Sequence, residues 1–308
     1  MKRILCFSIV LFGFYFINAY NVLADTVYAY NKSINKQEMA ESKTVIGSKS
    51  FHMIQEGEML IDLARKYDLG YNEIELANPG VDPWVPKVGS LIVIPHERII
   101  PDAPDNGIVI NLAELRLYYF FDSGGVKKVK TYPIGIGREG YNTPVGVYRV
   151  SIIEKNPTWD APPSVLKENP GMHAHMPPGP ENPLGTHWLR LSNTMYGIHG
   201  THRPYGVGRR VSRGCIRLYP EDIIKLANSV KVGTPIRIVK QKVKFGYKDG
   251  SIYVEVEEPL TNAAEQKSTL NYAVDILKKQ NLLDKVDMEA LQKAVNNPRG
   301  FPVKVSNN

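Results

Sequence analysis

Short apolar runs with strand-like alternation dominate the chain from residue 108 to about residue 240. Leu115, Leu117 and Tyr119 alternate with other side chains, which is the two-residue period of a half-buried strand. Similar runs cover residues 108–112, 129–136, 147–153 and 188–191. A helix is expected to begin at Pro220, because proline fits the first turn of a helix. We therefore expect a mainly β domain over residues 108–240, a sandwich or barrel-like sheet with a helix or two.

The remaining segments have other patterns. In chain order we expect a tether or first strand over residues 25–50, a compact strand-helix-helix-strand unit over 51–95, a linker over 96–107, and a hairpin followed by a helical C-terminal extension over 241–308. An Asp249-Gly250 pair predicts the tight turn of that hairpin, and two short helices are expected to follow it. The long, proline-rich segment 154–187 is expected to form a lid or the wall of a cleft.

The first 24 residues have the pattern of a secretory signal peptide. Two basic residues precede an apolar run over residues 4–17, and Ala24 ends a Val-Leu-Ala cleavage pattern. An uncleaved membrane anchor is the alternative, although the run is shorter than the ~20 residues that span a bilayer comfortably. Cleavage after Ala24 removes Cys6, so the mature chain holds one cysteine, Cys215.

Composition excludes several classes of protein. An apolar content of 43% excludes wholesale disorder. Two cysteines exclude a disulfide-dense scaffold and a thiolate-rich zinc module. The formal charge of +7 is spread along the chain without an arginine-rich run, so we expect no nucleic-acid partner. A modest positive excess suits an enzyme that acts on an anionic polymer.

The candidate chemistry lies in two motifs sixteen residues apart. His199 is followed by Gly200 and Thr201, and Cys215 lies in the run Ser-Arg-Gly-Cys-Ile-Arg. A thiolate is the reactive form of cysteine, and a nearby histidine can take the thiol proton. Amide groups of the turn before Cys215 are placed to stabilise an oxyanion. The alternative is an inert buried cysteine.

These motifs resemble the YkuD-type catalytic domain of L,D-transpeptidases, whose signature is His-Gly-Thr followed after some sixteen residues by Ser-x-Gly-Cys-[Ile/Leu]-[Arg/Asn]. Further family marks are Gly135-x-Gly137, Thr143-Pro144-x-Gly146 and Asn182-Pro183-Leu184-Gly185. The resemblance implies that Cys215 is the nucleophile, that His199 is the general base, and that the carbonyl of Gly200 orients the imidazole. Many members have a histidine where this chain has Arg213.

The resemblance also implies a substrate-binding set. Its members are Ser212, Arg213, Gly214, Tyr196 and Arg217. Arg217 is a candidate ligand for a substrate carboxylate, because guanidinium binds carboxylate in a bidentate manner, and a structural ion pair is its alternative. Tyr196 and Trp188 are candidates to line the cleft, and for Trp188 we favour core packing over that role. No cofactor is implied. The spacing of His173 and His175 allows metal ligation, but no arranged partner accompanies them, so no metal site is expected.

Residues 51–95 resemble a LysM domain, a unit that binds N-acetylglucosamine-containing glycan. The similarity lies in Gly57-Glu58-Met59-Leu60, Leu63-Ala64-Arg65-Lys66-Tyr67, Asn78-Pro79 and the terminal Gly89-Ser90-Leu91-Ile92-Val93-Ile94-Pro95. Glu58-Met59 departs from the usual Asp-Thr or Asp-Ser. The alternative is a LysM fold that serves only as a spacer.

The whole layout looks like the periplasmic L,D-transpeptidases of Gram-negative bacteria. It implies a thioester between Cys215 and the third residue, diaminopimelate, of a peptidoglycan tetrapeptide, with release of D-Ala and inhibition by carbapenems. The favoured acceptor is a lysine of an outer-membrane lipoprotein. The alternatives are a second diaminopimelate, giving a 3–3 cross-link, water, giving an L,D-carboxypeptidase, and a non-catalytic peptidoglycan-binding protein. A papain-like protease is excluded because there the cysteine precedes the histidine.

Overall fold

The computed structural model describes residues 26–32, 41–257 and 263–307. The expected export signal lies outside these residues. In the described part of the chain, every helix is too short or too polar to cross a lipid bilayer.

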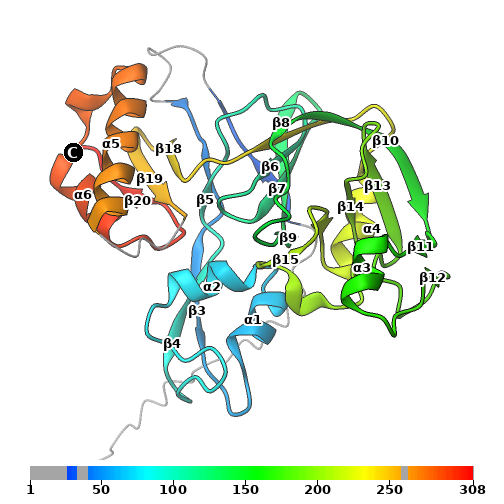
Figure 1. Cartoon of the computed structure of the whole chain (residues 1–308). Helices are drawn as coiled ribbons and strands as arrows, with labels where there is room; N and C mark the ends of the chain where they lie inside the picture. The colour runs from blue at the N-terminus through cyan, green and yellow to red at the C-terminus, as the bar shows by residue number, and fades with distance from the viewer. Residues whose placement is uncertain (1–25, 33–40, 258–262, 308) are drawn as a thin grey trace, which may run out of the picture.

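A nine-stranded sheet forms the domain that we expected to be catalytic, in the order β1-β8-β7-β6-β17-β10-β13-β14-β16. Its strands are β1 (Tyr28–Ala29), β6 (Gly107–Asn111), β7 (Arg116–Ser123), β8 (Val126–Pro133), β10 (Gly146–Lys155), β13 (His187–Leu191), β14 (Gly197–His199), β16 (Ile216–Arg217) and β17 (Pro235–Val239). Only the pairs β6–β17 and β14–β16 within it are parallel. Figure 1 shows the sheet curling around its core. The prediction of a mainly β domain is confirmed.

Alternation along the strands builds the core of this domain. Leu117, Leu189, Ile198 and Ile216 are fully buried in one cluster. Helix α4 (Pro220–Ser229) closes the cluster with its apolar face, which includes Ile223. The helix begins at Pro220 as expected. A short ladder of β9 (Ile136–Gly137) and β15 (Arg210–Ser212) lies beside the last strand of the sheet.

The segment from residue 49 to residue 95 has the expected order of strand, helix, helix, strand. It consists of β3 (Lys49–Met53), α1 (Leu60–Lys66), α2 (Tyr71–Ala77) and β4 (Leu91–Pro95), with β3 and β4 paired antiparallel. We call it the βααβ unit. Its small core includes Leu63, Ile74 and Ile92.

The segments expected as a tether or first strand and as a linker form paired strands in the residues that the structure describes. Strand β1 adds to the edge of the large sheet beside β8, and Tyr30 is buried next to it. Strand β2 (Val45–Ile46) pairs with β5 (Arg98–Ile99), and both strands are buried. The chain here is polar on average, but its few apolar residues find partners far along the sequence, which anchors both segments to the domains.

A buried ion-pair network joins the βααβ unit to the catalytic domain. Glu73 on α2 accepts hydrogen bonds from Arg116 on β7 at 2.7 Å through both carboxylate oxygens, and from Arg98 at 2.9 Å. All three side chains are at most 8% exposed. Tyr219 Oη also donates to the carbonyl oxygen of Leu69 at 3.0 Å. The two units therefore pack as neighbours with polar groups paired at their contact.

The C-terminal region begins with the expected hairpin, β18 (Val243–Lys248) and β19 (Ser251–Val256). Asp249 and Gly250 both have positive φ, 51° and 71°, as the predicted two-residue turn requires. Helices α5 (Ala263–Gln280) and α6 (Met288–Asn296) pack on the hairpin, and α5 is longer than expected. Strand β20 (Val303–Lys304) adds a third strand that was not expected. Figure 1 shows this region beside the catalytic sheet.

Segment 154–187 has more regular structure than expected. It contains the two-residue ladder of β11 (Trp159–Asp160) and β12 (His175–Met176), and helix α3 (Pro163–Glu168) between them. The helix begins at a proline, as helix first turns permit.

Candidate active site

The strand register places Cys215 and His199 on one face of the sheet. In the parallel pair β14–β16, Ile198 lies opposite Ile216 and His199 opposite Arg217. Both isoleucine side chains are fully buried in the core. Because successive side chains in a strand point to opposite faces, Cys215, Arg217 and His199 point away from that core. The thiol and the imidazole therefore come from adjacent strands and share one side of the sheet.

The imidazole of His199 is buried and held in one orientation. Its Nδ1 lies 2.6 Å from the carbonyl oxygen of Gly200. A carbonyl only accepts, so Nδ1 carries the proton and Nε2 is left as the basic nitrogen. Burial, assisted by the positive charge of Arg217, lowers the pKa of His199 to about 3, against the opposing effect of the Gly200 contact. The base is thus neutral at physiological pH.

Trp188 packs against this imidazole. Trp188 is the antiparallel partner of His199, with ring centroids 5.7 Å apart and planes inclined by 30°. A Cβ on Gly197 would lie 2.5 Å from the indole, so only glycine leaves room for it. Of the two readings of Trp188, core packing was favoured, but the structure fits the cleft reading: Leu189 and Leu191 face the core, and the half-buried Trp188 faces the site. The alternation of side chains along residues 187–191 already indicates that Trp188 lies on the face opposite Leu189 and Leu191.

The thiol of Cys215 is protonated in the free protein. The residue is half-buried, and its Sγ lies 3.9 Å from the carbonyl oxygen of Met195. Burial raises the pKa of the Cys215 thiol, and a backbone hydrogen bond from Gly197 and the charge of Arg217 oppose this only in part. Within the described residues no hydrogen bond joins Cys215 to His199. The pair therefore rests as neutral thiol and neutral imidazole, not as thiolate and imidazolium, and catalytic contacts of this kind often tighten only with substrate.

Three of the expected substrate-binding residues shape the turn before Cys215. Gly214 has a φ of +105°, and a Cβ there would lie 2.4 Å from the ring of Tyr196, so glycine is required. Ser212 Oγ donates to the carbonyl oxygen of Cys215 at 2.5 Å and accepts from the amide of Gly214 at 3.1 Å. Thr143, which sequence reasoning noted only as a family mark, donates to the carbonyl oxygen of Gly214 at 2.9 Å. These bonds fix the amides that precede the sulfur.

Arg217 brings an unpaired positive charge to the site. The side chain is half-buried, and among the described residues no carboxylate pairs with it. Its Nε is buried without a hydrogen-bond partner. Of the two readings of this residue, the structural ion pair is therefore wrong. The charge faces His199 and Cys215, whose pKa values it lowers.

Arg213 points away from the imidazole and toward α3. Its Nη1 donates to Ser164 Oγ at 2.6 Å, and its guanidinium pairs with the carboxylate of Glu168. It also lies over the ring of Tyr141, 5.0 Å from the centroid. The residue that replaces the usual histidine thus connects the catalytic turn to segment 154–187.

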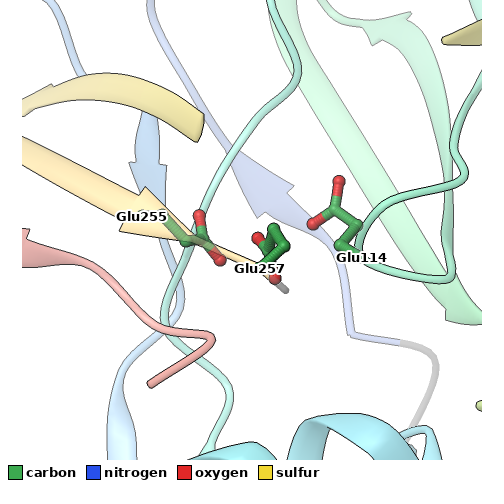
Figure 2. Close-up of side chains that lie close together, drawn as sticks. All are labelled: Glu114, Glu255 and Glu257. Carbon is green, nitrogen blue, oxygen red and sulfur yellow. The ribbon is translucent and has the colours of Figure 1, made fainter. Parts of the chain in front are cut away.

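One group of carboxylates in the described chain has the spacing of a metal site, and it lies outside the catalytic turn. Figure 2 shows Glu114, Glu255 and Glu257 close together. One oxygen of each carboxylate lies within 4.8 Å of the others. Lys244 Nζ lies 2.6 Å from Glu114 and 3.2 Å from each of the other two. The ammonium pairs with all three carboxylates, and burial raises the pKa values of Glu255 and Glu257, which favours their neutral forms, so we assign no metal here. His175, weighed as a metal ligand, instead lies 2.7 Å from Asp160.

Two protein families match successive parts of this chain. The YkuD family, described as the L,D-transpeptidase catalytic domain, matches residues 105–238, and the L,D-transpeptidase C-terminal domain matches residues 243–305. The solved catalytic domain of an E. faecium L,D-transpeptidase is 24% identical, with a TM-score of 0.34, and the match covers 45% of this chain and 99% of that one.

Curated relatives match nearly the whole chain. "Probable L,D-transpeptidase YcfS" of Escherichia coli K12 is 38% identical over 276 residues, which is 85% of each protein. "Probable L,D-transpeptidase ErfK/SrfK" of the same strain is 38% identical over 253 residues, covering 79% of this chain and 81% of that protein. Both the catalytic and the C-terminal domain are thus accounted for, and this chain belongs to the L,D-transpeptidase family of acyltransferases.

Proposed function

We propose that this protein is a periplasmic peptidoglycan L,D-transpeptidase in which Cys215 forms a thioester with the diaminopimelate of a tetrapeptide stem. The observation that carries the proposal is the placement of Cys215 and His199 on one sheet face, with Nε2 as the free basic nitrogen. Export by a cleaved signal over residues 1–24 belongs to the same proposal and rests on the sequence pattern.

In the first step the thiol proton moves to Nε2 of His199 as Sγ attacks the carbonyl carbon of diaminopimelate. The imidazole is neutral at rest, so it can accept this proton directly. The Gly214 amide already donates to Ser212 Oγ, so the amide of Cys215 at the end of this fixed turn is the donor that we assign to the oxyanion. When the tetrahedral intermediate collapses, the C–N bond to D-Ala breaks and the imidazolium returns its proton to the leaving amine.

In the second step an amine attacks the thioester, loses a proton to His199 and expels the Cys215 thiolate, which is reprotonated. Arg217 is the residue that we assign to a carboxylate of the stem, since its guanidinium faces the site without a protein partner. The same nucleophile explains the proposed covalent inhibition by carbapenems, whose strained ring carbonyl replaces the stem carbonyl.

The βααβ unit is proposed to be a LysM domain that holds the glycan. Its exposed apolar side chains include Trp84, which is 52% exposed. The buried contact of Glu73 with Arg116 fixes the unit to the catalytic domain, so a bound glycan would lie at a set distance from Cys215. A spacer role without sugar binding remains the alternative, and pull-down on peptidoglycan sacculi by wild type and Trp84→Ala separates the two.

The proposed acceptor is a lysine of an outer-membrane lipoprotein, on the basis of the domain layout alone. Muropeptide analysis of a deletion strain tests this choice. Loss of protein-linked muropeptides with unchanged diaminopimelate–diaminopimelate dimers supports the lipoprotein acceptor. The reverse pattern supports 3–3 cross-linking, and accumulation of tetrapeptides without either change supports the carboxypeptidase.

The activity itself is tested with purified protein and a soluble disaccharide-tetrapeptide. Wild type is expected to release D-Ala and to transfer the tripeptide to an added amine. A protein that binds the muropeptide without releasing D-Ala would instead be the non-catalytic peptidoglycan-binding protein.

A further inference from the structure

Two arginines hold one carboxylate beside the catalytic turn, in a place that the proposed reaction does not use. Arg138 Nη2 donates to Glu168 Oε2 at 2.9 Å, and Arg213 pairs with the same carboxylate. Tyr141 Oη donates to Glu168 Oε1 at 3.2 Å. Two guanidiniums facing one carboxylate leave one positive charge uncompensated at this point.

Both arginines are attached to the turn that precedes Cys215. Arg138 follows β9, and its amide donates to the carbonyl oxygen of Ser212 at 2.9 Å. Arg213 lies two residues before Cys215. Both guanidiniums lie over the ring of Tyr141, 4.8 and 5.0 Å from its centroid. This stacking and the backbone bond hold the two cations in place independently of the carboxylate between them.

The carboxylate comes from a different part of the chain. Glu168 is the last residue of α3, within the segment 154–187. Its side chain is 43% exposed, and those of Arg138 and Arg213 are 44% and 22% exposed. An ion pair this open to water adds little net free energy, because solvent screens it. A second carboxylate can therefore exchange with Glu168 at small cost.

We propose that Arg138 and Arg213 form a carboxylate-binding site for the donor stem, and that Glu168 occupies it in the free enzyme. This rests on the proposed function, since a tetrapeptide stem carries several free carboxylates. Arg213 and Arg217 lie on either side of Cys215 in sequence. Two carboxylates of one stem would then be bound on either side of the carbonyl that the sulfur attacks, and Glu168 would compete with one of them.

A purely structural role for Glu168, as a contact that fastens α3 to the catalytic turn, predicts a different effect of mutation on stem binding. If Glu168 only fastens α3 to the catalytic turn, then removing Glu168 or removing Arg138 breaks the same contact and changes binding in the same direction. If the arginines bind the stem, Glu168→Gln removes a competitor and Arg138→Gln removes a ligand. The two variants then change affinity in opposite directions.

The test is calorimetric binding of a soluble diaminopimelate-containing tetrapeptide to full-length protein carrying Cys215→Ala, which prevents turnover. Glu168→Gln is expected to lower Kd about threefold to tenfold, and Arg138→Gln to raise it about tenfold. Arg138→Lys should recover part of the loss, because it keeps the charge. Glu181→Gln, an exposed acid in the same segment, is the matched control and should leave Kd unchanged.

The proposal fails if Glu168→Gln and Arg138→Gln weaken binding alike, or if neither changes it. A stem whose side-chain and terminal carboxylates are amidated tests whether the effect depends on those carboxylates. Because it has no carboxylate to compete with Glu168, it should bind wild type and Glu168→Gln with equal affinity. D-Ala release by wild type is measured in parallel. If wild type releases D-Ala but the variants bind the stem with unchanged Kd values, the carboxylate site alone is overturned. If wild type neither releases D-Ala nor binds the stem, the site and the proposed function are overturned together.

Discussion

His199 lies directly opposite Arg217 in the parallel pair β14–β16. This register sets a permanent positive charge beside a buried imidazole. Both burial and the charge disfavour a second proton on the ring, so the pKa falls to about 3 and the ring stays a free base. The same guanidinium faces the thiol, where it opposes the effect of burial without overcoming it. One cation therefore affects the base, the nucleophile and the proposed substrate carboxylate.

Replacement of His199 by alanine should lower kcat by about 10²- to 10⁴-fold, because the thiol loses its proton acceptor. Since the imidazole is uncharged at rest, His199→Ala should leave the pH profile of Cys215 alkylation by iodoacetamide close to that of wild type. In wild type, the acid limb of kcat/KM should lie well below pH 6.5. A wild-type thiol that alkylates at full rate near pH 6 would indicate a thiolate–imidazolium pair and contradict this account.

Loss of the indole on the imidazole should reduce activity without unfolding the protein. Trp188→Leu frees the ring of His199 to turn, and a misplaced base lowers kcat by about 10- to 100-fold. Gly197→Ala should have a similar effect, because its new Cβ displaces the indole. Gly179→Ala, where a Cβ meets nothing within 4 Å, is the control. Full activity in Gly197→Ala would mean that the stacking has no role.

Arg217→Gln should raise KM for the tetrapeptide more than it lowers kcat, with kcat/KM falling about 10- to 100-fold, the range of a charge-assisted hydrogen bond. Removing the charge also removes one cause of the low pKa of His199, so the acid limb of the pH profile should move upward. Arg217→Lys should keep the acid limb low. If Arg217→Gln loses activity but its acid limb stays at the pH of the wild-type limb, the charge of Arg217 does not affect the pKa of His199.

Glu73 should contribute stability that depends on pH. Burial alone would raise its pKa, but Arg116 and Arg98 outweigh burial and hold the pKa at about 2, below the ordinary 4.5. A lowered carboxyl pKa stabilises the fold above the ordinary value, and this contribution is lost as the pH falls from about 4.5 toward 2.

Glu73→Gln should lower the free energy of unfolding by about 3–5 kcal/mol at pH 7, since it leaves two buried guanidiniums without a counter-charge. Urea unfolding measures the loss, which should shrink at pH 3. Glu75→Gln on the same helix is exposed and should change stability by less than about 0.5 kcal/mol. Equal stability of Glu73→Gln and wild type would exclude a stabilising network.

Local signals predicted much of this fold. The alternation of Leu115, Leu117 and Tyr119 is a strand, and Asp249-Gly250 is a hairpin turn, because both depend on residues close in sequence. The packing of the segment before residue 50 was harder to predict, for the opposite reason. The short run Val27 to Tyr30 lies before a mainly polar stretch, and the burial of Tyr30 depends on Phe120, ninety residues away, against whose ring it packs.

In the candidate site, too, some residues could be predicted from local sequence, and others depend on contacts between distant segments. Cys215 and His199 stood out through motifs, and the sheet register explains why those motifs lie together. The alternation of residues 187–191 could place Trp188 on the face opposite Leu189 and Leu191, but its contact with His199 depends on which strand lies next to it and on the missing side chain of Gly197. Arg213 was grouped with substrate-binding residues by position, and only the placement of α3 shows its partner, Glu168.

The most direct test of the central claim is mass spectrometry of the protein after reaction with a tetrapeptide stem in the absence of an acceptor amine, quenched in acid. The account predicts that wild type gains the mass of the tripeptide acyl group on the peptide that contains Cys215, with one D-Ala released per adduct, and that Cys215→Ala shows neither the adduct nor the release. Release of D-Ala by folded Cys215→Ala, or an acyl group on another residue, would contradict it.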